Sequence, residues 1–194
     1  MSDQSGESSG HYAFSCITSD IDVVDAQGKS VPADGKTMGE IVVKGNVVAK
    51  GYLLNEKGTN EAFEGGAFHT GDIGVIHPSG RIQIKDRSKD IIISGGENIC
   101  SIEVENLLQG HPNVQEVAVI AEAHPHWGEV PVAFVKLKTA IKEEEIISWA
   151  RDRIAHFKAP KKIIAVNELP RTSTGKVQKH ILRDRLRSAS DQVN

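Results

Sequence analysis

The sequence predicts an α+β fold, in which a small β-rich part is followed by a compact domain with a mixed sheet flanked by helices. Short β-branched runs separated by glycine turns fill residues 20–85. A charged connector at residues 86–90 then leads into alternating strand and amphipathic-helix patterns that extend over residues 91–188. With 194 residues, 39% of them hydrophobic, the chain is long enough for one large domain or two small ones.

The β-rich part opens after residues 1–19, which are rich in Ser, Gly and acids and show no periodicity. We expect them to be a disordered tail or residues added to the protein. The elements expected next are strands at 21–24 and 39–45, a short helix at 55–62, and a hairpin over 74–84 that turns at 77–80.

The second part begins with a buried strand, Asp90 to Ser94, that closes in the glycine pair Gly95 and Gly96. Ser101 is expected to cap a helix that stops at Gly110. The remaining elements are strands at 114–121 and 132–137, an amphipathic helix at 142–155, a strand at 162–166, and a terminal helix after residue 176, followed by a tail at 189–194.

The composition bears on the location of the protein, the state of its cysteines and the charge of its ligands. No apolar run approaches a membrane span, and the N-terminus lacks a signal-peptide pattern, so we expect an intracellular, cytoplasmic protein. Cys16 and Cys100 have no metal-ligand spacing and predict free thiols in a reducing compartment. The net charge of −3 argues against a nucleic-acid binder. Residues 158–187, however, hold nine Lys or Arg and only two acids, which favours a phosphate-bearing ligand.

Three segments occur in a characteristic order: Phe68-His69-Thr70-Gly71-Asp72, then Gly80 to Glu97, then Pro170-Arg171-Thr172-Ser173-Thr174-Gly175-Lys176. In that order and spacing, the chain resembles the C-terminal portion of an acyl-CoA synthetase. These enzymes belong to the adenylate-forming superfamily, which also holds luciferase and the adenylation domains of peptide synthetases. The resemblance covers roughly residues 20–187.

The resemblance implies that Asp72 and Arg87 bind the nucleotide. Two carboxylate oxygens can accept both protons of a ribose diol, and a guanidinium offers a planar fork for ribose or phosphate oxygens. By itself Asp72 is typical of a turn residue before a strand at 73–76. Arg87 by itself is equally consistent with a surface salt bridge to Asp86 or Asp90.

The resemblance also implies a catalytic lysine, Lys176, which would lie between the carboxylate and the α-phosphate during adenylation. Lys89 matches the hinge about which the mobile C-terminal domain rotates between two half-reactions. Ser94, Gly95, Gly96 and Glu97 match the loop that faces the coenzyme A pantetheine tunnel, where side chains would block the thiol. From charge alone, we expect coenzyme A phosphates near Lys158, Lys161, Lys162 and Arg183.

The chain lacks the phosphate loop and acyl pocket of full-length relatives. ATP, coenzyme A, Mg²⁺ and the carboxylic acid substrate would therefore be bound mainly by an N-terminal part that is missing, and the chain alone should be inactive. Two alternatives remain open: a carrier-protein-loading adenylation module, and a non-catalytic nucleotide-binding, coenzyme A-binding or regulatory module. No metal site is expected, no peroxisomal address ends the chain, and the oligomeric state cannot be read from the sequence.

Overall fold

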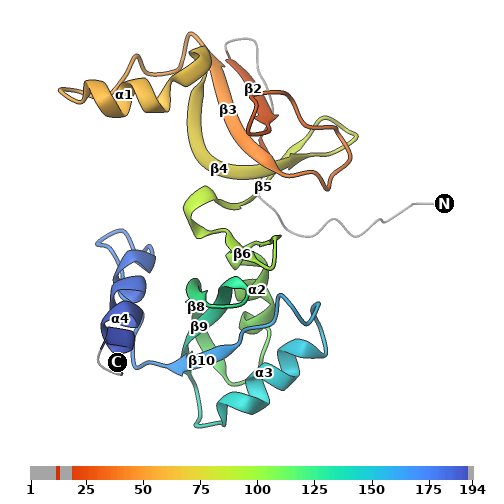
Figure 1. Cartoon of the computed structure of the whole chain (residues 1–194), viewed down its shortest axis with the longest axis vertical. Coiled ribbons are helices and arrows are strands. Elements are labelled where there is room, and N and C mark those ends of the chain that lie inside the picture. The colour runs from red at the N-terminus through yellow and green to blue at the C-terminus, as the bar shows by residue number, and fades with distance from the viewer. Residues whose placement is uncertain (1–11, 14–18, 192–194) are drawn as a thin grey trace. The chain divides into compact units, whose positions relative to one another are not determined.

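The computed structural model describes residues 12–13 and 19–191, which form two compact units that divide between Lys89 and Asp90 (Figure 1). The boundary falls within the connector expected at residues 86–90. Most of the expected N-terminal tail lies outside the described residues, as does Cys16. Tyr12–Ala13, however, forms strand β1 rather than part of a structureless tail. None of the described helices is long and apolar enough to cross a membrane.

The first unit is built on one antiparallel sheet with the order β1-β5-β4-β3-β2. Its core is a cluster of buried β-branched side chains on these strands and on the loop between β2 and β3: Val23, Val31, Ile41 and Ile82. Asn55 begins the short helix α1 by accepting a 2.9 Å hydrogen bond from Gly58 N. The bounds of the strands are β2 Ser19–Val24, β3 Gly39–Gly45, β4 Phe68–Ile76 and β5 Ile82–Arg87, with α1 at Glu56–Ala62 and the 3₁₀ turn η1 at Glu64–Gly66.

The second unit is a mixed sheet covered by helices on both faces. Strand β10 runs parallel to β9, whereas β6 and β8 pair with β9 antiparallel. The bounds are η2 Ser88–Asp90, which crosses the boundary, then β6 Ile92–Ser94, β7 Glu97–Ile99, α2 Ser101–Gln109, β8 Val114–His124, β9 Gly128–Leu137, α3 Glu143–Arg151, β10 Lys162–Ala165 and α4 Lys179–Asp191.

Alternation along β8 distributes its side chains between two cores. Val119 packs against α2 and α3, whereas Ile120 packs on the opposite face against Leu182 and Leu186 of α4. Figure 1 shows α3 and α4 on opposite sides of the β8–β9–β10 sheet. The α+β class and the mixed sheet flanked by helices are therefore as predicted.

Several local predictions were wrong. The strand expected from Asp90 starts only at Ile92, because residues 88–90 form a 3₁₀ turn, and Ile93 is 54% exposed. Strand β7 was not anticipated. Ser101 does not cap α2 but is its buried first residue, and its Oγ accepts a 2.7 Å hydrogen bond from Lys179 Nζ. Helix α4 continues to Asp191, into the expected tail.

Candidate functional site

Asp72 lies within β4, at an irregularity in the sheet rather than at the turn predicted from sequence. Val42 pairs with His69 and Glu40 pairs with Ile73, so residues 70–72 stand opposite Ile41 alone. The extra residues form a bulge in which Gly71 adopts φ +73°, a conformation that favours glycine. Because bulges change the direction of a side chain, this one determines where the Asp72 carboxylate points.

The Glu40 carboxylate holds the bulge in place with both oxygens. Its Oε1 accepts a 3.1 Å hydrogen bond from Gly71 N, and its Oε2 lies 2.8 Å from His69 Nδ1. The hydrogen bond to Glu40 raises the pKa of His69 above its ordinary value. The Thr70 hydroxyl completes the arrangement, since it donates to Ile41 O at 2.7 Å and accepts from Asp72 N at 3.1 Å.

Sequence reasoning missed Glu40 and His69. The two residues are separated by 29 positions, so no spacing rule links them. The available signal was a Glu directly before the apolar run Ile41-Val42-Val43 of β3, where a carboxylate needs a partner.

Arg87 pairs with Asp72 rather than with either acid considered from the sequence. The two residues are register partners on β4 and β5, and Arg87 Nε lies 3.3 Å from Asp72 Oδ1. Asp86 is buried and accepts a 2.8 Å hydrogen bond from Arg87 N. Asp90 binds Arg183 within the second unit. The structure thus brings together the two residues for which the resemblance implies a nucleotide role.

The boundary between the units passes through η2. Lys89 is an exposed residue of this turn, whereas Asp90 is held by an ion pair with Arg183 of α4. The exposed fraction of the Asp90 side chain is only 11%, so the first residue of the second unit is anchored to that unit. The hinge role of Lys89 stays a prediction.

Residues Ser94 to Glu97 form the tight end of the β6–β7 hairpin, with Ser94 and Glu97 paired and both glycines at positive φ. The connection between β8 and β9 holds this hairpin in place. Gly95 N donates a 2.8 Å hydrogen bond to Trp127 O, and Ile93 N donates one of the same length to Glu129 Oε2. A side chain at Gly95 would place its Cβ 3.1 Å from Trp127 Cε3. No local pattern in the sequence indicates this contact.

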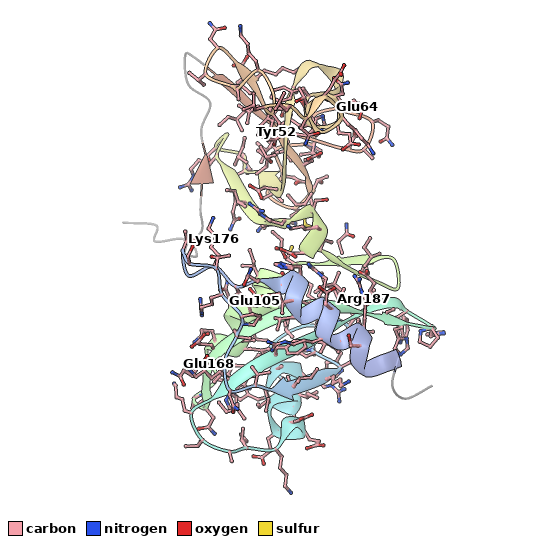
Figure 2. All side chains as sticks on the ribbon, turned by 90° about the vertical axis from the view of Figure 1, so that its left-hand side faces the viewer. Tyr52, Glu64, Glu105, Glu168, Lys176 and Arg187 are labelled. Carbon is pink, nitrogen blue, oxygen red and sulfur yellow. The ribbon has the colours of Figure 1, made fainter. Side chains whose placement is uncertain are left out.

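Lys176 is exposed on a loop that closes on itself before α4. Arg171 and Val177 form a β-bridge at its base, and Thr172 N donates to Lys176 O at 2.9 Å. Lys176 N in turn donates to Thr172 Oγ1 at 3.2 Å, while Gly175 permits the turn with φ +85°. No ion pair joins the Lys176 ammonium to any of the described side chains. Figure 2 shows Lys176 on the loop that leads into α4.

The basic residues expected near coenzyme A phosphates are largely engaged with acids. Lys158 Nζ lies 2.8 Å from Glu103, and Lys162 Nζ lies 3.8 Å from Glu122. Arg183 is bound to Asp90. These ion pairs neutralise part of the positive charge of residues 158–187, and the coenzyme A phosphate site expected there stays a prediction.

Residues 12–13 and 19–191 contain no group of three or more His, Cys, Asp or Glu side chains arranged to hold a metal ion. The acid nearest to a nucleotide role, Asp72, already faces a guanidinium. The described residues therefore do not fit a Mg²⁺ site of their own.

Comparison with known proteins places these features in context. A family model described as "AMP-binding enzyme C-terminal domain" matches residues 103–176. Among curated proteins of Arabidopsis thaliana, a probable acyl-activating enzyme 12, peroxisomal, is 50% identical, over 88% of this chain and 33% of its own length. Butyrate–CoA ligase AAE11, peroxisomal, is 55% identical, over 85% of this chain and 30% of its own.

Among solved structures, ATP-bound MatB from Rhodopseudomonas palustris superposes with a TM-score of 0.79 at 37% identity. The match covers 87% of this chain and 34% of that one. The chain therefore spans about a third of the length of the relatives it matches.

Proposed function

Because this chain contains an AMP-binding enzyme C-terminal domain and is homologous to the C-terminal part of acyl-activating enzymes and CoA ligases, we propose that it is that part of an ATP-dependent, AMP-forming acyl-CoA synthetase. Its boundaries are residues 20–85 for the end of the large domain, 86–90 for the hinge and 91–188 for the mobile domain. The acyl pocket and the phosphate loop belong to the two thirds of the relatives' length that this chain does not span.

The observation that carries the proposal is the exposed position of Lys176. Its ammonium is exposed, is not paired with a described side chain, and lies on a loop ordered by hydrogen bonds. In adenylation the substrate carboxylate attacks the α-phosphate of ATP and pyrophosphate leaves. Both reactants are anions, so a cation placed between them stabilises the transition state. The role of Lys176 is electrostatic, and it does not transfer a proton.

Asp72 and Arg87 hold the nucleotide in this proposal. The Asp72 carboxylate accepts hydrogen bonds from ribose hydroxyls, and the partly exposed Arg87 guanidinium contacts ribose or phosphate oxygens. In the second half-reaction the thiol of coenzyme A attacks the acyl carbon and AMP leaves. Rotation at Lys89 before this step brings the hairpin of Ser94, Gly95, Gly96 and Glu97 to the thiol channel. Its two glycines leave the channel open.

The test uses a chimera in which residues 20–194 replace the matching segment of the butyrate–CoA ligase. We expect butyryl-CoA formation by the chimera and no pyrophosphate release by the 194-residue chain alone. Changing Lys176→Ala in the chimera should lower the adenylation rate by about 10²–10³-fold, the usual effect of removing one such donor. Robust turnover by the isolated chain, or an unimpaired Lys176→Ala chimera, would contradict the proposal.

The names of the relatives favour free coenzyme A over a carrier protein as acyl acceptor. The regulatory alternative is tested by titrating the isolated chain with AMP and with coenzyme A, since a pure interaction module should bind neither. Both curated relatives described above carry names that include "peroxisomal". The cytoplasmic location expected from the sequence therefore stays a prediction, to be checked by fractionation.

A further inference from the structure

The loop that carries Lys176 has no hydrophobic anchor of its own. All residues from Arg171 to Lys176 are exposed, and those from 172 to 175 are small and polar. Their conformation therefore depends on hydrogen bonds, and most of these run between members of the loop. Such bonds fix the shape of the loop but not its position on the domain. Something else must connect the loop to the sheet.

The Arg171 side chain makes that connection. Its Nη1 donates to the carbonyl oxygen of Gly175 at 2.5 Å, and its Nη2 donates to Glu116 Oε2 at 2.6 Å. The Gly175 carbonyl belongs to the peptide bond that joins Gly175 to Lys176. One planar guanidinium therefore links the peptide immediately before Lys176 to a carboxylate on β8.

The Glu116 carboxylate is itself held in place. Glu116 pairs with Lys136 of β9 just after a register shift between Val114 and Glu116, and Lys136 Nζ lies 3.5 Å from Glu116 Oε1. The hydrogen bond from Arg171 and the nearby Lys136 charge both lower the pKa of Glu116, so the carboxylate stays ionised. The sheet thus presents a fixed negative charge to the base of the loop.

We propose that Arg171 and Glu116 are positioning residues for adenylation, which hold the backbone of Lys176 at the place from which its ammonium reaches the two reacting anions. The inference rests on the function proposed above. Lys176 has a flexible four-carbon stem, so the position of its ammonium is only as well defined as its backbone. A small displacement of a catalytic group costs up to about 10²-fold in rate.

The competing explanation is that this ion pair only stabilises the fold. The exposed fractions of the Arg171 and Glu116 side chains are 44% and 28%, and pairs this exposed contribute little to stability. Both residues line an open surface hollow rather than a packed core, so their removal leaves no internal cavity. A purely structural role would also affect both half-reactions equally, whereas a role at Lys176 affects adenylation alone.

The experiment compares Arg171→Ala, Glu116→Ala and the double variant in the chimera. We expect each to lower kcat for adenylation by about 10- to 100-fold with little change in the KM for ATP. Transfer from preformed butyryl-adenylate to coenzyme A should stay within about twofold of the unsubstituted chimera, since Lys176 takes no part in it. The kcat of the double variant for adenylation should be no lower than that of the slower single variant. The kcat of Arg171→Lys should lie between those of the unsubstituted chimera and Arg171→Ala, because one ammonium cannot reproduce the planar fork of a guanidinium.

The matched control is Glu122→Ala. Glu122 also lies on β8 and pairs with a lysine, Lys162 at 3.8 Å, but no hydrogen bond or ion pair joins either residue to the described residues of the Lys176 loop. It should leave adenylation unchanged. If Arg171→Ala and Glu116→Ala adenylate at the control rate while Lys176→Ala is impaired, the positioning role is wrong and the proposed function stands. If Lys176→Ala is also unimpaired, both are overturned.

A second measurement does not need an active chimera. In the isolated chain, the amides of Gly175 and Lys176 donate within the loop, so their hydrogen exchange reports its order. Exchange of these amides, followed by NMR, should be several-fold faster in Arg171→Ala and in Glu116→Ala than in Glu122→Ala. If exchange of these amides is unchanged in both variants, the positioning role of Arg171 and Glu116 is wrong, whatever rates the chimera shows.

Discussion

Asp72 and Arg87 face each other across strands β4 and β5, with Arg87 Nε 3.3 Å from Asp72 Oδ1. The sheet register therefore sets the distance between the two groups, although the bulge before Asp72 sets the direction of its carboxylate. Their exposed fractions are 30% for Asp72 and 59% for Arg87, so a ligand can still reach both. The two side chains form an ordered polar surface to which ribose hydroxyls can hydrogen-bond.

Replacing Asp72 by Asn in the chimera tests the nucleotide role of this pair. The change keeps the shape but removes the charge that strengthens hydrogen bonds to the ribose, a loss of about 1.5–3 kcal/mol. We expect the KM for ATP to rise by about tenfold or more. Glu61→Gln serves as the control, because Glu61 belongs to an exposed ion pair on α1. If the two variants have equal KM values for ATP, Asp72 does not bind the nucleotide.

Gly95→Ala should impair thioester formation more than adenylation. The new Cβ would lie 3.1 Å from Trp127 Cε3 and would occupy a position with φ +60°, so the hairpin has to shift. The backbone strain costs about 1–2 kcal/mol. The two half-reactions are measured separately, with butyryl-adenylate supplied for the second.

Gly80→Ala separates strain from contact, because Gly80 has φ +79° but no atom within 4 Å of an added Cβ. It should lower stability by a similar amount and leave thioester formation unchanged. A Gly95→Ala chimera that forms butyryl-CoA as fast as Gly80→Ala would show that the hairpin position does not matter for transfer.

Leu182→Ala should destabilise the second unit by about 2–5 kcal/mol, because Leu182 is fully buried between α4 and the sheet. Urea unfolding of the isolated chain, followed by tryptophan fluorescence, measures this, since Trp127 and Trp149 both belong to that unit. Leu53→Ala is the comparison, because Leu53 is 93% exposed. Midpoints that move equally in the two variants would be inconsistent with the packing described here.

The first unit should lose stability as the pH rises above about 6.5. Glu40 raises the pKa of His69 above 6.5, so the folded state binds the proton more tightly than the unfolded state. The stabilisation is complete below pH 6.5 and disappears as the pH passes through the raised pKa. Thermal unfolding followed by amide signals of β4 checks this, and His69→Gln should abolish the slope. A slope that survives in His69→Gln would assign it to another group.

His111 in the second unit provides the opposite case. Burial, together with the charge of Arg153, lowers the pKa of His111 below 6.5, so the folded state prefers the neutral ring. The second unit should therefore lose stability as the pH falls below about 6.5. His111→Gln should remove this acid sensitivity, as read by tryptophan fluorescence, and leave the slope of the first unit intact, as read by amide signals of β4.

Local patterns in the sequence were enough to predict most elements. The amphipathic period of α3 and the turn at residues 77–80 each involve neighbours in the chain. Predictions from local patterns failed where a distant residue binds the same group. Ser101 looks like a cap from its neighbours, but its hydroxyl binds Lys179, which lies 78 residues further along the chain.

The sequence by itself determined the α+β class, because periodicity and turn chemistry act over a few residues, and its resemblance to a known family picked out the motifs that contain Asp72, Arg87 and Lys176. Only the tertiary structure decided that Arg87 pairs with Asp72, that Glu40 holds the bulge and that Arg171 ties the Lys176 loop to Glu116. Each of these contacts joins residues between 15 and 55 positions apart, and only the folded sheets bring such residues within hydrogen-bonding distance.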